Sequence, residues 1–342
     1  MTSNSFLGNV PVRVKWVLAY FAALVMAGMV TGDYPRYVLT LWMIYSLSAI
    51  GLNIVLGFGK IYSLGHGGFM LVGAYGTAVA LNHFHWPVPI AIAAAAIIAT
   101  LVGIAVGLPA IRLKHFSLAI VTFAFGITLF QLVKGTSYTG GPQGMFLDVV
   151  PLQAMWKGRV LWLAAVLLCL AGLGISYSVM SSRTGRALRM IAANETVARS
   201  FGIRVTFHKL AAFGLAALLG AVAGGMHALI TGVVAPETFG PDLSILIFSA
   251  VMIGGQGRLL GPLLGAAFVV AIPELTQDAR ALAQIIYAVL FLAVVTLFPQ
   301  GLLGMIEAGW KKVTGTKPSV SAAAAQNQKV QETQQVQEKG ST

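Results

Sequence analysis

Long apolar runs, separated by short polar connections, repeat along most of the chain. Most of them are long enough to cross a hydrocarbon core of about 30 Å as a helix. They are continuous, whereas strands of a transmembrane barrel alternate residue by residue. The pattern therefore predicts an all-α polytopic membrane protein with about ten transmembrane helices. The expected spans are roughly 16–30, 37–56, one ending near 82, 87–110, 115–133, 160–180, 207–230, one ending near 254, 259–271 and 282–297.

Composition agrees with this class. Of the 342 residues, 57% are hydrophobic and 9% charged, with a mean hydropathy of +0.84, whereas a soluble domain carries about 25% charged residues. The single cysteine, Cys169, lies inside an apolar run, so no disulfide within the chain is expected. The first apolar run has full length and no cleavage site follows it, so we expect a retained helix and no signal peptide.

The organisation expected from these patterns is a single membrane domain with polar ends. Residues 1–12 are a polar N-terminal lead, and 13–305 form the transmembrane domain, interrupted by a long basic loop at 181–209. Residues 306–342 form a low-complexity tail rich in Ala, Gln, Lys and Ser, which we expect to be cytoplasmic and disordered. The short connections leave no room for a soluble catalytic domain.

Charge predicts the orientation. The net charge is +12, and the excess lies in loops and in the tail. In a membrane protein this indicates orientation and attraction to an anionic bilayer, and it does not indicate a nucleic-acid partner. The positive-inside rule then predicts that both termini and the 181–209 loop are cytoplasmic. Lys134, Lys157 and Arg159 fall outside, against the rule.

The basic loop, Ser181–Lys209, carries six Arg or Lys residues against one acid, Glu195. Asn194 is placed to cap a second short helix and Gly202 to end it, so the loop is predicted to be a helix, a break and a helix. Leu188, Ile191, Ala198 and Phe201 have near-helical spacing and form an apolar stripe. One interpretation is a solvated loop that sets topology; the other, favoured by the stripe, is a docking element for a cytoplasmic partner.

Five glycines occur in the twelve residues from Gly57 to Gly68. A Walker A loop is excluded, because no lysine in the chain is followed by Ser or Thr. Two interpretations stay open: an unwound helix at a substrate site, or close helix packing through small residues. The candidate translocation-path residues are Tyr62, Ser63, Gly65, His66 and Gly67.

Catalysis and metal binding are not predicted. His66 has no partner at ligand spacing, so a buried neutral imidazole is the first interpretation and a substrate contact the second. The sequence shows neither a Ser/His/Asp arrangement nor paired carboxylates within the spans. We therefore expect no catalytic residue and no metal site.

Several motifs together carry a family resemblance. The chain resembles the branched-chain amino-acid ABC transporter permeases over roughly residues 40–305, and of the two permease types it looks more like the LivM type. The motifs are Gly51-Leu52-Asn53-Ile54-Val55-Leu56-Gly57, Tyr62-Ser63-Leu64-Gly65-His66-Gly67-Gly68-Phe69, Thr139-Gly140-Gly141-Pro142-Gln143-Gly144, Gly254-Gly255-Gln256-Gly257, and Pro299-Gln300-Gly301-Leu302-Leu303-Gly304.

This resemblance implies a subunit of an importer in the bacterial inner membrane. Its partners are a second permease, two cytoplasmic ATPases and an extracytoplasmic solute-binding protein. ATP and Mg²⁺ are then bound by the ATPases and no cofactor by this chain. The basic loop is similar to the family's ATPase-coupling loop, although Thr196 and Val197 follow Glu195 where two alanines are usual, and Gly202 lies one residue further along. The implied coupling residues are Arg186, Leu188, Arg189, Ile191, Asn194, Glu195, Ala198, Phe201 and Gly202.

The solute is less closely indicated than the family. Relatives of this permease type import urea, short amides or other amino acids, and the few charges within the spans suit any zwitterionic or neutral solute. A different class, a stand-alone secondary transporter, predicts ionisable residues within the spans for ion coupling. The chain has almost none.

Overall fold

The computed structural model describes residues 24–26, 28–110, 115–147, 158–275, 289, 292, 296 and 301–305. The chain divides into two units, 1–303 and 304–342, and all the elements named below lie in the first. The predicted 306–342 tail lies outside the described residues. So do most of the first predicted span and almost all of the tenth, and the count of ten helices therefore stays a prediction.

Six helices are long and apolar enough to cross a membrane within the described residues. They confirm a helical membrane fold, and two shorter apolar helices accompany them. The long ones are α2 (Asp33–Asn53) with its π-helical extension η1 (Ile54–Phe58), α4 (Val88–Ala110), α5 (His115–Gly135), α7 (Arg159–Ser181), α10 (Val205–Thr231), and α11 (Pro241–Gly254) together with the 3-10 turn η4 (Pro236–Phe239) that leads into it. The shorter ones are α3 (His66–Asn82) and α12 (Gly261–Leu275).

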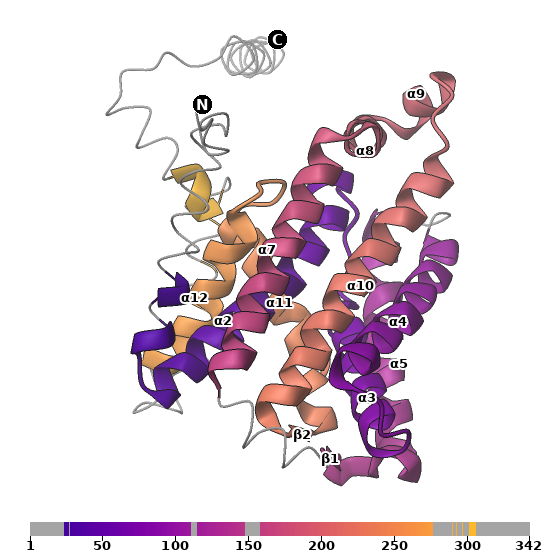
Figure 1. Ribbon diagram of the computed structural model, residues 1–342. Helices are drawn as coiled ribbons and strands as arrows, with labels where there is room; N and C mark the ends of the chain where they lie inside the picture. Colours follow the sequence, from indigo (N-terminus) through magenta and orange to yellow (C-terminus); the bar gives the residue numbers. More distant parts are fainter. Residues whose placement is uncertain are drawn as a thin grey trace, which may run out of the picture. The chain divides into compact units, whose positions relative to one another are not determined.

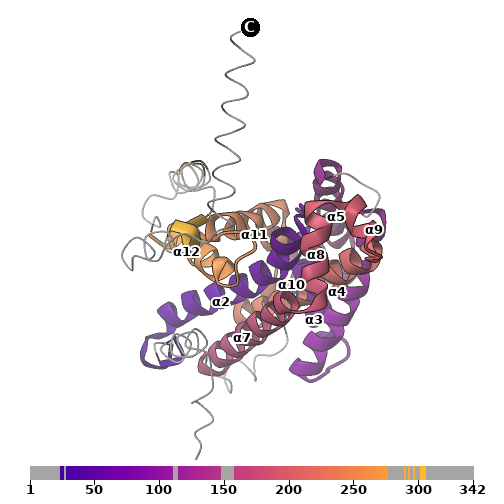
Figure 2. The same ribbon diagram turned by 90° about the horizontal axis from the view of Figure 1, so that it is seen from above.

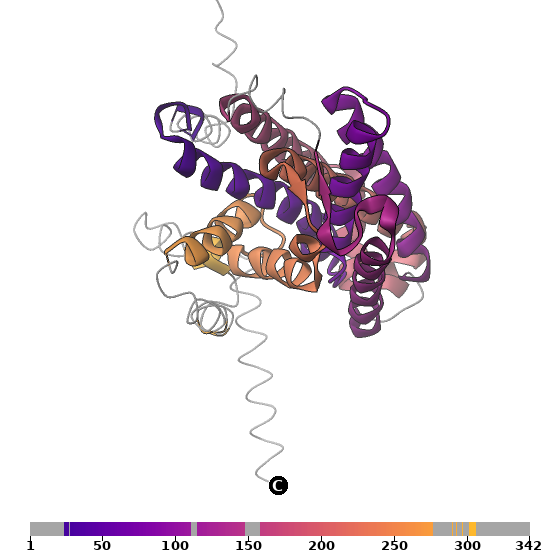
Figure 3. The ribbon, with the colours of Figure 1, turned by 90° about the horizontal axis from the view of Figure 1, so that it is seen from below.

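Helix α10 lies at the centre of the first unit. It contacts α3 and α4 on one side and α2 on the other, as Figures 2 and 3 show from opposite directions. Small residues allow this approach: a Cβ added at Gly224 would lie 1.9 Å from the carbonyl oxygen of Met70. Apolar burial barely distinguishes protein from lipid in a membrane, so such close backbone packing supplies much of the helix association.

On the α2 side, α7, α11 and α12 complete the packing. The cytoplasmic and extracytoplasmic ends predicted from charge correspond to two ends of α10. At one end lie the short helices α8 (Arg183–Ala193) and α9 (Glu195–Ser200); at the other, the strands β1 (Met145–Phe146) and β2 (Val233–Val234) pair antiparallel (Figure 1). Single 3-10 turns flank the strands: η2 (Ser137–Thr139), η3 (Gly141–Gln143) and η4 (Pro236–Phe239).

Lys134, one of the exceptions to the charge rule, is paired in the structure. It lies at the end of α5, forms an ion pair with Glu237 at 3.0 Å and lies over the ring of Phe130. This ion pair joins the end of α5 to η4.

Candidate functional site: the coupling loop

The loop between α7 and α10 folds as a helix, a break and a helix, which confirms the sequence prediction. The Ser182 hydroxyl accepts a hydrogen bond from the Gly185 amide at 3.3 Å and begins α8. Asn194 has an extended backbone, and its side chain accepts from the Val197 amide at 3.1 Å, which begins α9. Gly202, with φ of 74°, then turns the chain toward α10, in a region that disfavours residues with a Cβ.

The apolar stripe faces its own chain. Leu188 and Ala198 are 0% exposed and Ile191 is 5% exposed. Leu188 belongs to the main core, and Ile191 and Ala198 pack with Val205 at the start of α10. Of the four stripe residues only Phe201 is exposed, at 71%. Most of the stripe therefore anchors the loop to the membrane domain, and a partner can reach only Phe201 and the polar residues around it.

Glu195 forms two ion pairs, one within α9 and one that ties α9 to α10. Glu195 accepts hydrogen bonds from Lys209 of α10 and from Arg199, both at 2.7 Å. Burial alone would raise the pKa of Glu195, but the hydrogen bonds from Lys209 and Arg199 outweigh it, and the pKa of this carboxyl lies below its usual value. The single acid of the loop thus ties α9 to a transmembrane helix.

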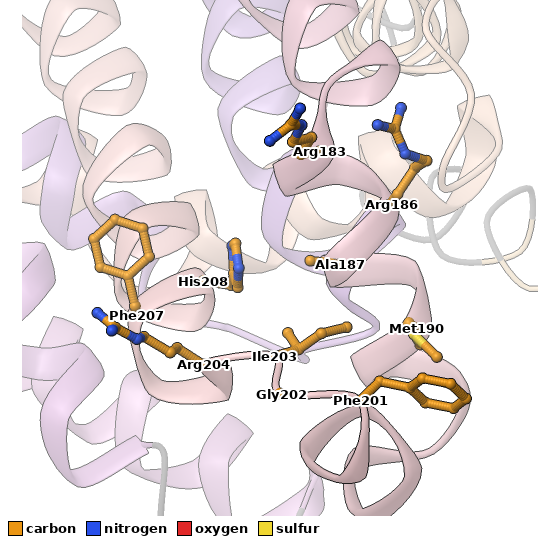
Figure 4. Close-up of a pocket in the computed structure, with 10 residues that line it drawn as sticks. All are labelled: Arg183, Arg186, Ala187, Met190, Phe201, Gly202, Ile203, Arg204, Phe207 and His208. Carbon is orange, nitrogen blue, oxygen red and sulfur yellow. The ribbon is translucent and has the colours of Figure 1, made fainter.

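A pocket of about 770 Å³ opens between α8 and the start of α10. Figure 4 shows Arg183 and Arg186 reaching it from α8, and Arg204, Phe207 and His208 from the start of α10 and the residue before it. Arg186 donates to the carbonyl of Ser181. The remaining lining residues are Ala187, Met190, Phe201, Gly202 and Ile203.

The predicted translocation-path residues lie in the irregular segment before α3 and in its first turn. Tyr62 is 36% exposed, whereas Ser63 and His66 are buried at 2% and 1%. The glycines pack closely against neighbouring helices: a Cβ added at Gly65 would lie 2.2 Å from the Thr122 carbonyl oxygen, and one at Gly67 2.6 Å from Ser244 Oγ. This geometry favours the packing interpretation for both glycines.

Sequence reasoning missed a contact that joins two of the motifs. The Asn53 side chain accepts from the Gly257 amide at 2.8 Å and donates to the Arg258 carbonyl at 3.0 Å. It is fully buried at the end of α2, directly before the π-helical turn η1. Asn53 and Gly257 each belong to a motif visible in the sequence, but nothing in the spacing of the two motifs indicates that they meet.

Comparison with known proteins identifies the family. A family model described as "Branched-chain amino acid transport system / permease component" matches residues 34–295. The chain belongs to this family. It is 31% identical to the high-affinity branched-chain amino acid transport system permease protein LivM of Salmonella typhimurium and 32% identical to that of Escherichia coli; each alignment covers 81% of this chain and 71% of the relative. Identity to LivH of Salmonella typhimurium is 24%, over 78% of this chain and 94% of that protein.

The higher identity to LivM places this permease in the LivM type, as its motifs indicate. The family match covers α2 through α12 and therefore includes the coupling loop and the Asn53 contact. The relatives are transport permeases, and the sequence likewise predicts no catalytic residue in this chain.

Proposed function

We propose that this chain is a transmembrane subunit of an ABC importer for branched-chain amino acids in the bacterial inner membrane. It pairs with a second permease, receives solute from an extracytoplasmic binding protein, and is driven by two cytoplasmic ATPases that bind ATP and Mg²⁺. This chain binds no cofactor of its own. The family supports the transport role, since its LivM and LivH members are both branched-chain amino acid permeases.

The observation that carries the proposal is the anchored loop. Helices α8 and α9 lie outside the spans and are fixed to α10 by the packing of Ile191 and Ala198 on Val205 and by the Glu195–Lys209 pair. They present Phe201 and several arginines outward. A loop that only sets topology needs charge and does not need this rigid attachment. A rigid attachment can transmit a push from an ATPase to α7 and α10.

The solute is proposed from the family and from the chemistry of the spans. Arg36 is a buried charge of the described spans, and it is paired with Asp33 at 2.8 Å near the start of α2. A translocation path without an unpaired buried charge suits a zwitterionic solute. We place Tyr62, Ser63 and the buried His66 beside this path. Urea, amides or other amino acids are the alternative solutes within the same role.

Reconstituted transport tests this proposal. The chain is purified with its co-expressed ATPase, second permease and binding protein, placed in proteoliposomes, and supplied with radiolabelled leucine or urea. We expect ATP-dependent leucine uptake that is lost when the Walker lysine of the ATPase is replaced. ATP-dependent uptake of urea alone would change the solute. Uptake by this chain alone, driven by an ion gradient, would identify a secondary transporter instead.

A further inference from the structure

Two arginines of the pocket between α8 and α10 lack a protein acceptor. The side chains of Arg183 and Arg204 form no hydrogen bond or ion pair with any residue that the structure describes, whereas the side chains of Arg199 and Lys209 of the same loop are both paired with Glu195. The ten residues that line the pocket include no acid among the described part of the chain. The pocket therefore concentrates positive charge that the protein itself does not neutralise.

The pocket lies where two membrane spans end. Helix α7 ends at Ser181, two residues before Arg183, and α10 begins at Val205, directly after Arg204. Both arginines thus lie at the ends of helices that are long and apolar enough to cross a membrane, where the anionic surface of a bilayer attracts basic residues. Phe207, in the first turn of α10, is 64% exposed. An exposed apolar ring on a helix that can span the membrane is suited to contact with lipid chains, which are themselves apolar.

Two helix N-termini add to the positive potential. Arg183 is the first residue of α8, and Arg204 is the N-cap of α10. The unpaired amides at the start of a helix favour a negative charge. In addition, His208 Nδ1 is buried without a partner among the described residues. The guanidinium groups and the helix N-termini favour a phosphate group, and the exposed ring of Phe207 favours acyl chains attached to it.

We propose that this pocket binds the phosphate group of an anionic phospholipid. Arg183 and Arg204 contact the phosphate, and Phe207 lies against the glycerol and the upper acyl chains. Such a lipid bridges α8 and α10 and so strengthens the attachment of the loop to the spans. An acidic side chain of a protein partner would use the same arginines, but it would leave the lipid-level position of Phe207 without a role.

The test measures lipid retained by the purified full-length permease with its partner subunits. Native mass spectrometry counts the bound lipid as phosphatidylglycerol or phosphatidylcholine is titrated. The double variant R183Q/R204Q is compared with K60Q/R199Q. The control removes the same charge from exposed residues at the same end of the unit, outside the pocket. We expect one phosphatidylglycerol to bind in preference to phosphatidylcholine, with affinity about thirtyfold weaker in R183Q/R204Q and nearly unchanged in the control.

Three results would overturn the proposal. Equal losses in the two double variants would mean general attraction to anionic lipid. Displacement of the bound phosphatidylglycerol by millimolar inorganic phosphate would identify a site for a soluble anion. Loss of ATPase co-purification in R183Q/R204Q with lipid binding unchanged would assign the pocket to an acidic partner segment. Since no readout involves transport, failure here leaves the proposed importer role untouched.

Discussion

At the scale of single residues, Asn53 connects parts of the chain that are 204 residues apart. Its amide group satisfies one backbone donor and one backbone acceptor in the turn between α11 and α12. This turn lies close to η1, the extension of α2: a Cβ added at Gly57 would lie 2.3 Å from the Gly257 nitrogen. This position needs a side chain that can both donate and accept a hydrogen bond, and an apolar side chain of the same size can do neither.

Replacement of Asn53 by leucine is expected to destabilise the permease by about 1–3 kcal/mol, because the Gly257 amide loses its acceptor in a buried site. The matched control is Ser48→Ala, which removes a buried hydroxyl of the same helix that has no partner among the described residues. We expect the control to cause no comparable loss of stability, because no hydrogen bond between described residues is removed. Thermal unfolding of the purified protein distinguishes them, and equal losses would contradict the assigned role of Asn53.

Glu195 makes the attachment of α9 depend on pH. Its pKa is lower in the folded protein than the ordinary value of 4.5, because Lys209 and Arg199 stabilise the charged form. The unfolded chain therefore binds more protons near this pH, and the stabilisation is present above pH 4.5 and is lost as pH falls through the folded pKa. Glu195→Gln should be less stable than the wild type at pH 7, and the two melting temperatures should converge as pH falls below 4.5 and through the folded pKa. A constant difference across this range would exclude the linkage.

At the scale of elements, α8 is a helix with two different faces. Its buried face contacts the membrane domain, and Leu188 Cδ2 lies 3.9 Å from the Cβ position of Gly59, beside η1. The exposed face carries the arginines. Movement of α8 is therefore transmitted to the end of α2 by direct packing. Leu188 and Phe201, which both belong to the predicted apolar stripe, thus have different roles.

Leu188 and Phe201 should respond differently to truncation. Leu188→Ala should destabilise the permease by about 2–5 kcal/mol, because it leaves a cavity in the core. Phe201→Ala should change stability by less than about 0.5 kcal/mol, since the ring is 71% exposed. Thermal unfolding tests both variants. Co-purification with the ATPase should weaken with Phe201→Asp while the amount of folded permease is unchanged; a folded Phe201→Asp permease that retains its ATPase would remove this residue from the contact.

A hydrogen bond joins the start of α3 to the start of α11. The Gly67 amide donates to Ser244 Oγ at 3.0 Å, and the same oxygen occupies the space of a Gly67 side chain. Gly67→Ala should therefore lower the amount of assembled permease, and Gly67→Leu more so. The double variant Gly67→Ala with Ser244→Gly should recover part of that loss, as measured by size-exclusion chromatography. Normal assembly of Gly67→Leu with blocked uptake per complex would instead place this glycine in the translocation path.

At the scale of the whole membrane unit, positive charge gathers at the α8 end. Lys60 lies just after η1, which packs on α8, and the Arg258 carbonyl is held by Asn53 beside the same segment. Asp33 and Asp242 begin helices whose first turns lie toward the other end. This distribution predicts that the α8 end is cytoplasmic.

Cysteine labelling tests the orientation. Thr184 lies in α8, and Gln143 ends η3, two residues before β1. Helix α8 and strand β1 lie at opposite ends of the membrane unit (Figure 1). In a Cys169→Ala background, Gln143→Cys should react with a membrane-impermeant maleimide in intact cells, and Thr184→Cys only after the cells are opened. Labelling of both positions in intact cells would refute the topology.

The sequence by itself determined the membrane class, the limits of most helices, the helix–break–helix of the loop and the family. These features depend on local chemistry: long apolar runs, the Asn194 cap and the Gly202 turn act within a few residues. Periodicity also placed Leu188, Ile191 and Ala198 on one face of the loop. It could not say what that face meets, because an apolar face can contact a partner or its own chain equally well.

Only the tertiary structure decided which surfaces are covered. In a membrane, lipid and protein interior are similarly apolar, so hydrophobicity does not separate a packed residue from an exposed one. The contacts of Asn53 with Gly257 and of Gly67 with Ser244 join residues 204 and 177 positions apart. No local pattern encodes such pairs, and they arise only when α2, α3 and α11 pack together. The pocket of Arg183 and Arg204 is of the same kind, because two helices that are separate in the sequence must meet to form it.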